Sequence, residues 1–202
     1  MEEELRRFKE FKRNYVYELK DVEEIDGIQY YAGEPLIDED GKEIGDCEKW
    51  INVGYKHSGP YAKVLSNLFP YEFEFRGKKL QSIESFFQGI KFKSIEMQNM
   101  VFNYSGLNSN YIKACTSYDW KKTGYVYFQG EAINRYAEEY YDIVDELYIS
   151  AIQNLLYRNV LKTCEREIIH LIGAKEKSET VFTRYEFEKQ LNCLKDFLKK
   201  ER

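Results

Sequence analysis

The sequence predicts a single α+β domain that is mainly helical and carries small β-hairpins. Long stretches have apolar side chains at steps of three and four residues, which is typical of amphipathic helices. Between them lie short alternating segments separated by glycine turns, which is typical of hairpins. The chain has 202 residues, 43% hydrophobic and 32% charged, with three prolines and no linker, repeat or low-complexity tract. These properties indicate one folded domain with a sizeable core.

Residues 1–55 are expected to form an N-terminal helix and a β-rich extension, ahead of a core formed by residues 56–202. The helix is predicted over residues 2–18, where one apolar face contains Leu5, Phe8, Phe11 and Tyr15. Residues 28–51 are β-like and rich in turns. A hairpin turn is predicted at Asp40-Gly41, between Leu36-Ile37 and Ile44.

A second hairpin is predicted over residues 73–80, with its turn at Arg76-Gly77. Ser82 follows as the N-cap of a helix, since its hydroxyl can accept a hydrogen bond from a free backbone N–H. This helix carries three polar side chains, Glu84, Gln88 and Lys91.

The spacing of Glu84, Gln88 and Lys91 places them on one stripe of the helix. Ile83, Phe86, Phe87 and Ile90 form a separate apolar face. A polar stripe between apolar surfaces is expected to be partly buried and to need hydrogen-bond partners. Glu84 and Lys91 lie roughly 10 Å apart along the axis, which is too far for an ordinary ion pair but suits two groups closing on a sugar-sized ligand. The alternative is a solvated helix face without a function.

Residues 95–115 predict a broken helical stretch interrupted at Gly106, and residues 125–128 predict a short strand before a turn at Gly130. A long helix follows, whose apolar face contains Tyr140, Val144, Leu147, Tyr148, Ala151 and Leu155. Residues 168–172 form a continuous apolar run consistent with a buried strand. His170 lies within this run and is therefore expected to be a core histidine.

The last helix has the clearest start signal. Thr183 as N-cap and Glu186 at the third helical position form a capping box, and Phe182 with Phe187 forms a hydrophobic staple. Its core face is predicted to contain Phe187, Leu191, Leu194 and Leu198.

Several classes of site are not expected. The histidines are His57 and His170, and Cys47, Cys115, Cys164 and Cys193 include no C-x-x-C pair. We therefore expect reduced thiols, with no metal site, cofactor or Ser-His-Asp triad. The charged N-terminus lacks the apolar segment of a signal peptide, and no apolar run approaches the ~20 residues of a membrane span. The sequence predicts a cytoplasmic protein.

The net charge of −5 and the pI near 5.3 argue against binding along extended phosphate backbone. Local lysine clusters could still receive a pyrophosphate or one nucleotide end, or could simply solvate the surface; they are Lys78-Lys79, Lys121-Lys122, Lys91, Lys93 and Lys113. The chain also contains 18 Tyr, 13 Phe and 2 Trp. Tyrosine offers a stacking face for a planar base, although it can equally serve in a core.

Residues 65–92 resemble a pattern of the NADAR superfamily, also called YbiA-like, in which an LSNF-type turn precedes an S-x-E-x-x-Y/F-Q-x-x-K-F helix. Here the two elements read LSNL from Leu65 and SIESFFQGIKF from Ser82. A weaker match to G-R-x-(V/I)-x-x-R-x-x-W contains Gly130, Ile133, Arg135 and, near the family's Trp, Tyr140. The N-D-x-x-W-G tail of many members is absent, which indicates a different branch. The resemblance covers roughly residues 50–200.

The resemblance implies a YbiA-like fold and cleavage of an N-glycosidic bond in a ribosylated substrate. The expected reaction is removal of ADP-ribose from a guanine base, in a nucleotide or in modified DNA or RNA. Hydrolysis of ribosylamino intermediates of the riboflavin pathway is the alternative reaction. A sensor that binds ADP-ribose without turnover is the alternative from another functional class.

Under this hypothesis the catalytic residues are Glu84 and Lys91. Glu84 would stabilise oxocarbenium-like charge on the ribose or activate water, because the first turn of a helix favours a carboxylate. Lys91 would either hold a phosphate or hydroxyl as a cation or form a Schiff base at C1 of an opened ribose.

Ligand contacts are expected from Ser66, Asn67, Phe87, Gln88, Arg135 and Tyr140. The amides of Asn67 and Gln88 can donate and accept hydrogen bonds, as the ribose hydroxyls require. Tyr140 offers a flat face for stacking. Arg135 fits a clamp for phosphate or carboxylate, unless it forms a surface ion pair instead.

Overall fold

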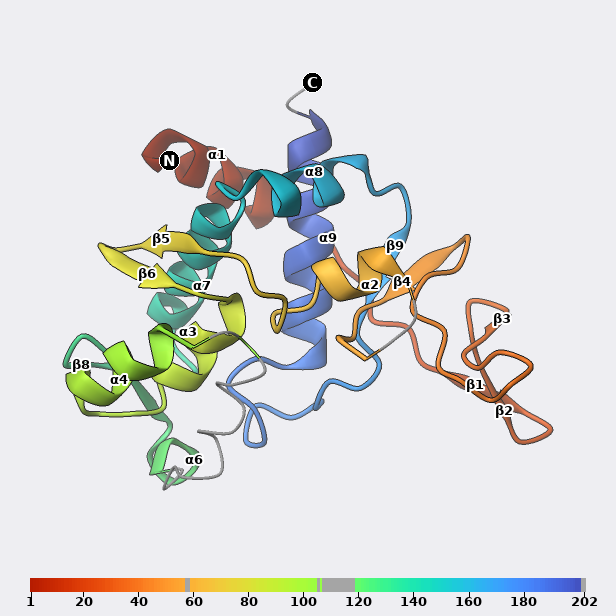
Figure 1. Cartoon of the computed structure of the whole chain (residues 1–202), viewed down its shortest axis with the longest axis horizontal. Helices are drawn as coiled ribbons and strands as arrows, with labels where there is room; N and C mark the ends of the chain where they lie inside the picture. Colours follow the sequence, from red (N-terminus) through yellow and green to blue (C-terminus); the bar gives the residue numbers. More distant parts are fainter. Residues whose placement is uncertain (57–58, 105, 107–118, 201–202) are drawn as a thin grey trace.

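Helix α9 (Arg184–Lys200) runs through the middle of the molecule (Figure 1). It starts with the predicted capping box: the N–H of Thr183 donates to the Glu186 carboxylate at 2.7 Å, and the N–H of Glu186 donates to Thr183 Oγ1 at 3.2 Å. The predicted staple is also confirmed, with the rings of Phe182 and Phe187 6.3 Å apart. The structure is a computed structural model that describes residues 1–56, 59–104, 106 and 119–200.

The predicted α+β class with small β elements is confirmed. The other helices are α1 (Glu2–Arg13), α2 (Pro60–Val64), α3 (Ile83–Gly89), α4 (Ile95–Phe102), α6 (Asp119–Thr123), α7 (Glu138–Ala151) and α8 (Leu155–Thr163). The strands are β1 (Glu23–Ile25), β2 (Ile28–Tyr31), β3 (Glu34–Pro35), β4 (Trp50–Asn52), β5 (Phe73–Phe75), β6 (Lys78–Leu80), β7 (Tyr125–Phe128), β8 (Glu131–Asn134) and β9 (Glu167–Ile169).

The main core lies between the helices α1, α7 and α9 and the β5–β6 hairpin. The apolar side of α1 packs onto α9 through Phe8 and Phe197, whose rings lie edge to face at 5.4 Å. The predicted hairpin over residues 73–80 covers α7, and its turn is confirmed by positive φ angles at Arg76 (45°) and Gly77 (72°). Two positive φ angles in a two-residue turn match the twist of the flanking strands.

Strands β4 and β9 form a two-stranded parallel sheet in which Asn52 pairs with Ile169. All other strand pairs are antiparallel neighbours in sequence. Because parallel strands end at the same edge, this pair brings the residues after Asn52 next to those after Ile169. Nothing in the local sequence predicts this long-range pairing.

Three predicted boundaries are wrong. The first helix ends at Arg13 instead of continuing to residue 18, although Tyr15 still packs against the core. The predicted helix through Leu155 is two helices, because Asn154 caps α8 by accepting from the N–H groups of Leu156 and Tyr157. The predicted strand over residues 168–172 ends at Ile169. Of the stretch predicted over residues 95–115, α4 is helical to Phe102, whereas 105 and 107–115 lie outside the described residues.

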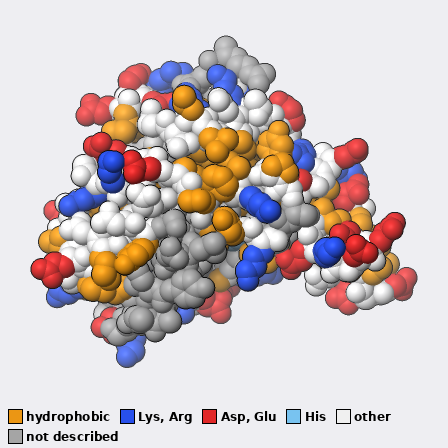
Figure 2. Space-filling model, in the orientation of Figure 1, with side chains coloured by type: hydrophobic (Ala, Val, Ile, Leu, Met, Phe, Trp, Pro, Cys, Tyr) orange, Lys and Arg blue, Asp and Glu red, His pale blue; other side chains and the backbone are white. Residues whose placement is uncertain are grey.

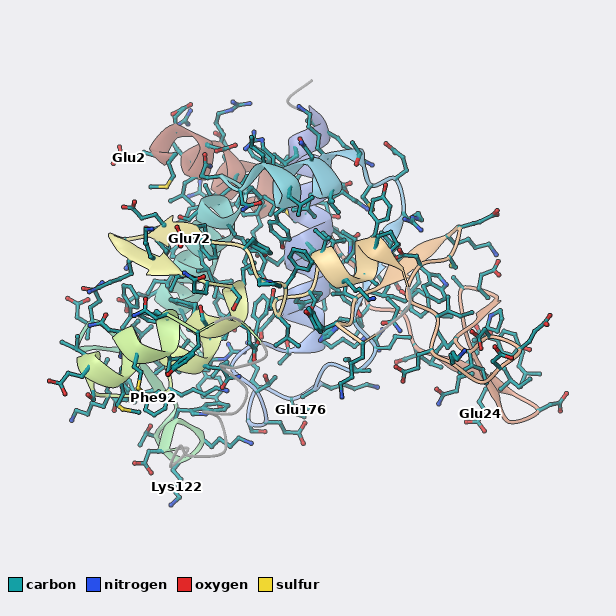
Figure 3. The ribbon with its side chains drawn as sticks, in the orientation of Figure 1. Glu2, Glu24, Glu72, Phe92, Lys122 and Glu176 are labelled. Atoms are coloured by element: carbon teal, nitrogen blue, oxygen red, sulfur yellow. The ribbon has the colours of Figure 1, made fainter. Side chains whose placement is uncertain are left out.

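Strands β1–β3 and the following hairpin, whose predicted turn at Asp40-Gly41 is present, form a lobe that projects from one side (Figure 1). Its small core contains Tyr31, Leu36, Trp50 and Ile169. Residues 18–49 hold twelve Asp and Glu against three Lys. Red acidic side chains accordingly gather on this lobe in Figure 2, and Glu24 points outward from it in Figure 3. Among the helices of the described ranges, none has the length and apolarity that crossing a membrane requires.

Candidate active site

A cavity of about 540 Å³ opens where the parallel strands β4 and β9 end. In open α/β sheets, ligands characteristically bind at the carboxyl ends of parallel strands. The wall is built by residues 53–55 after β4, 66–68 after α2, one side of α3, part of α6, residues 170–174 after β9 and residues 179–182 before α9. Six of the eight predicted site residues lie here: Ser66, Asn67, Glu84, Phe87, Gln88 and Lys91.

The Ser66-Asn67 turn is fixed against the start of α3. Ser82 caps α3 as predicted, its Oγ accepting from the N–H of Ser85 at 3.1 Å. The N–H of Glu84 donates to the backbone carbonyl of Asn67 at 2.8 Å. This bond joins the two parts of the sequence pattern, so the turn determines where α3 begins relative to the cavity.

The side chain of Asn67 is oriented by a buried tyrosine. The hydroxyl of Tyr148, on α7, donates to Asn67 Oδ1 at 2.9 Å. Burial raises the pKa of Tyr148 well above its ordinary value, so this hydroxyl stays protonated and remains a donor. Because Oδ1 of Asn67 accepts from Tyr148, the NH₂ group of this amide remains to donate a hydrogen bond to another partner.

Glu84, Gln88 and Lys91 form a hydrogen-bonded chain. Gln88 Nε2 donates to Glu84 Oε1 at 2.6 Å, and Lys91 Nζ donates to Gln88 Oε1 at 2.8 Å. Helix α3 ends at Gly89, but the N–H of Lys91 bonds to the carbonyl of Gln88 at 3.3 Å, so the turn continues and Lys91 keeps its place on the stripe. Gln88 is only 4% exposed. The stripe is therefore not a solvated helix face, and Gln88 spans the gap between the two charged groups.

Aromatic rings form the apolar part of the wall. Phe87 and Phe182 stack at 4.8 Å with their planes 18° apart. Phe87 is 3% exposed, so it mainly supports Phe182, which is the more accessible of the pair. Tyr55 also lines the cavity and is half-buried.

Arg135 and Tyr140 were predicted to contact ligand, and the structure does not bring them to the cavity. Arg135 is fully buried and pairs with Glu186 at 2.5 Å, with its guanidinium over the Tyr140 ring at 4.5 Å. The Tyr140 hydroxyl donates to the backbone carbonyl of Val181. The clamp predicted for Arg135 thus holds an internal carboxylate, and both residues fix the segment before α9 that forms one cavity wall.

His170 was predicted to be a core histidine, but it lines the cavity. Its Nδ1 lies 2.7 Å from the carbonyl oxygen of Val53, which can only accept, so Nδ1 carries a proton. Its ring packs on Phe187 at 4.6 Å. The available signal was its position directly after an apolar strand, where side chains reach the sheet edge.

Of the predicted lysine clusters, the structure places Lys91 and Lys121 at the cavity. Lys122 is exposed and points away from α6 (Figure 3), and Lys78, Lys79 and Lys93 are not part of the wall. Lys113 lies outside the described residues. The polar and aromatic lining also includes Glu179, Thr180 and Trp120, to which no sequence motif pointed.

In the described ranges no three His, Cys, Asp or Glu side chains gather as metal ligands would. Cys47, Cys164 and Cys193 are free thiols, and Cys115 and His57 lie outside those ranges.

The model of the family described as bacteriophage protein GP30.3 matches residues 60–196. An uncharacterized 17.1 kDa protein from the Gp30-rIII intergenic region of Enterobacteria phage T4 is 31% identical over 139 residues, covering 67% of this chain and 90% of that protein. The chain is similar in structure to the E. coli protein YbiA, solved by NMR, with a TM-score of 0.49 and 12% identity over 78% of this chain and 89% of that one.

Proposed function

The chain belongs to the bacteriophage protein GP30.3 family, and from the residues that this family domain gathers at the cavity we propose that it is an N-glycosidase acting on a ribosylated substrate. The observation that carries the proposal is the Glu84–Gln88–Lys91 chain on the cavity wall. It presents a carboxylate and an ammonium group at two separate points, joined by a buried amide.

Cleavage of a C1–N bond requires charge stabilisation and a water molecule. As the bond breaks, its electron pair goes to nitrogen, which takes a proton, and positive charge develops on C1 and the ring oxygen. The Glu84 carboxylate supplies the opposite charge or accepts a proton from the water that attacks C1. This reaction consumes water and needs no redox step.

Lys91 keeps two roles within the proposal. Its ammonium can hold a hydroxyl or phosphate oxygen, with Gln88 Oε1 fixing its position. As a free amine it can instead attack C1 of an opened ribose and displace the substrate nitrogen, which leaves with a proton as the free base; water then hydrolyses the resulting Schiff base to the sugar aldehyde and the free amine of Lys91. The two roles predict different products of chemical trapping.

The cavity also suits a nucleotide-sized substrate. Its volume of about 540 Å³ lies within the roughly 300–1,000 Å³ usual for small-molecule sites. Phe182 and Tyr55 provide aromatic surface for a base, and Asn67 provides an amide for ribose hydroxyls. Together with the resemblance of residues 65–92 to the NADAR pattern, these features favour ADP-ribose attached to guanine as the substrate.

Mass spectrometry of a substrate panel tests the proposal. The protein is incubated with an ADP-ribosylated guanine nucleotide, the same modification in an oligonucleotide, and a ribosylamino intermediate of riboflavin synthesis. We expect released ADP-ribose and an intact guanine product, with Glu84→Gln protein run in parallel to exclude a contaminating enzyme. If only the ribosylamino compound gave a product, the protein would instead be an N-glycosidase of riboflavin-pathway intermediates. Tight ADP-ribose binding with no product from any substrate would refute the proposed N-glycosidase activity and identify the protein as a sensor.

A further inference from the structure

A second cavity, of about 500 Å³, lies between α1, α7 and α9. Helix α1 contacts both α7 and α9, and the part of α9 that lines the cavity is its N-terminal half, the lower part of this helix in Figure 1. Phe182 belongs to the walls of both cavities, so its ring separates the second cavity from the candidate active site. Helix α1 precedes the segment matched by the family, residues 60–196, so one wall comes from outside the family domain.

The floor of the second cavity presents hydrogen-bond donors. Lys12 pairs with Asp145 and also donates to Gln190 Oε1 at 2.5 Å. Gln190 is 2% exposed, and although its side chain interacts with the Asp145 carboxylate, its Nε2 has no well-aligned hydrogen-bond partner among the described residues. A buried amide donor without an acceptor is costly, and native structures contain few such groups. A ligand oxygen would satisfy it.

The wall carries an excess of positive charge. The lining holds five basic and four acidic side chains. Three of the carboxylates are already paired, Asp142 with Lys9 at 2.5 Å, Asp145 with Lys12, and Glu186 with Arg135, and the fourth, Glu138, is exposed. Arg13 and Lys189 also line the cavity, and neither pairs with a carboxylate in the described parts of the chain. These two cations are therefore available to an anion.

Aromatic surface completes the wall. Tyr141 and Tyr185 line the cavity beside Phe182, and the Lys189 ammonium lies 5.8 Å from the centre of the Tyr185 ring. Cations next to tyrosine faces suit a molecule that joins an anionic group to a planar ring. We propose that the second cavity is a binding site for a nucleoside monophosphate, with Arg13 and Lys189 on the phosphate and a tyrosine face on the base.

Isothermal titration calorimetry with AMP as the probe tests this site. In the wild-type protein we expect AMP to bind more tightly than either adenosine or inorganic phosphate, because the cavity offers both kinds of contact. The double variant Arg13→Ala/Lys189→Ala should weaken AMP binding at this site at least tenfold. Both side chains are on the rim and only partly buried or exposed, so the fold should be retained.

The control is Lys63→Ala/Lys93→Ala, which removes the same charge from exposed lysines that line neither cavity. It should bind AMP like the wild type. Since AMP can also enter the first cavity, Lys91→Ala is titrated as well and should keep the binding that the Arg13 and Lys189 variant loses. Equal losses in the rim and control variants, loss only in Lys91→Ala, or adenosine binding as tight as AMP would each overturn the proposal. None of these outcomes depends on glycosidase activity.

Discussion

At the residue scale, two hydrogen bonds fix the position of Glu84. Its backbone N–H donates to the Asn67 carbonyl, and its carboxylate accepts from Gln88. Lys91 reaches the same amide from the other side. Because Gln88 separates the two charged groups, each can serve a different part of a substrate.

Glu84→Gln is expected to retain the fold and substrate binding but to lose most turnover. Glutamine has nearly the same shape and removes only the negative charge that, in the proposed reaction, stabilises the cationic transition state. Loss of one preorganised electrostatic group costs on the order of 10²–10³-fold in rate. The measurement is kcat on the substrate found in the panel, with Glu179→Gln, another carboxylate on the cavity wall, as the matched control. Near-wild-type kcat in Glu84→Gln would remove Glu84 from the reaction.

Borohydride trapping separates the two roles of Lys91. If a Schiff base forms, reduction during turnover leaves a sugar adduct on Lys91, and Lys91→Arg is inactive although it keeps the charge. If Lys91 only holds an oxygen, no adduct forms and Lys91→Arg keeps measurable activity with a raised KM. Peptide mass spectrometry identifies the modified residue. An adduct on Lys121, the other lysine of the cavity wall, would contradict the Schiff-base role of Lys91.

At the scale of an element, the start of α9 depends on a buried ion pair. The Glu186 carboxylate accepts from Arg135, from the backbone of Thr183 and from the Tyr141 hydroxyl. Burial alone would raise the pKa of Glu186, but the hydrogen bond and charge of Arg135 outweigh burial and hold that pKa below its ordinary value. The pair orders residues 179–187, which lie between the two cavities.

Glu186→Gln should destabilise the fold by about 3–5 kcal/mol at neutral pH, because it leaves the fully buried Arg135 without a countercharge. A carboxyl whose pKa is lowered by folding contributes stability above its unfolded pKa, near 4.5, and loses that contribution as pH falls through the folded value. The free energies of unfolding of wild type and variant in urea should therefore converge below about pH 4.5.

The control is Glu72→Gln, which breaks an exposed ion pair with Lys79 and should change stability little. A Glu186→Gln protein as stable as the wild type at pH 7 would contradict the structural role of the pair.

At the scale of the whole molecule, charge is unevenly distributed. The net charge is −5, yet residues 18–49 alone hold twelve acidic and three basic side chains, concentrated on the lobe at the right of Figure 2. Neutralisation of several phosphates at once requires a continuous basic surface. An acidic lobe beside the domain works against such binding.

Unmodified RNA or DNA should therefore bind weakly at physiological salt, whereas an oligonucleotide with one ADP-ribosyl group should bind much more tightly, because that group can enter the cavity. Fluorescence anisotropy at two salt concentrations measures both. Turnover should be unaffected by a chelator, because the proposed chemistry uses Glu84 and water. Equal affinity for modified and unmodified strands, or loss of activity with the chelator, would contradict this assignment.

Local signals in the sequence determined most of the elements of this protein and six of the residues that line its candidate site. The Arg76-Gly77 turn, the Ser82 cap, the Thr183–Glu186 capping box and the Glu84–Gln88–Lys91 stripe each depend on residues within a few positions of one another. Residue type and spacing determine hydrogen bonds and steric contacts at that range, so the sequence pattern was sufficient to predict these local features.

The tertiary structure decided the rest. The parallel pairing of β4 with β9 joins strands more than a hundred residues apart and brings Val53 and His170 to one cavity. The same long-range packing buries Arg135 against Glu186 and takes it away from the ligand site that its sequence context suggested. Such contacts depend on which surfaces of distant elements meet, and loop closure between them leaves no local pattern in the sequence. The sequence therefore determined the Glu84–Gln88–Lys91 stripe, and packing determined which residues of the cavity wall lie opposite it.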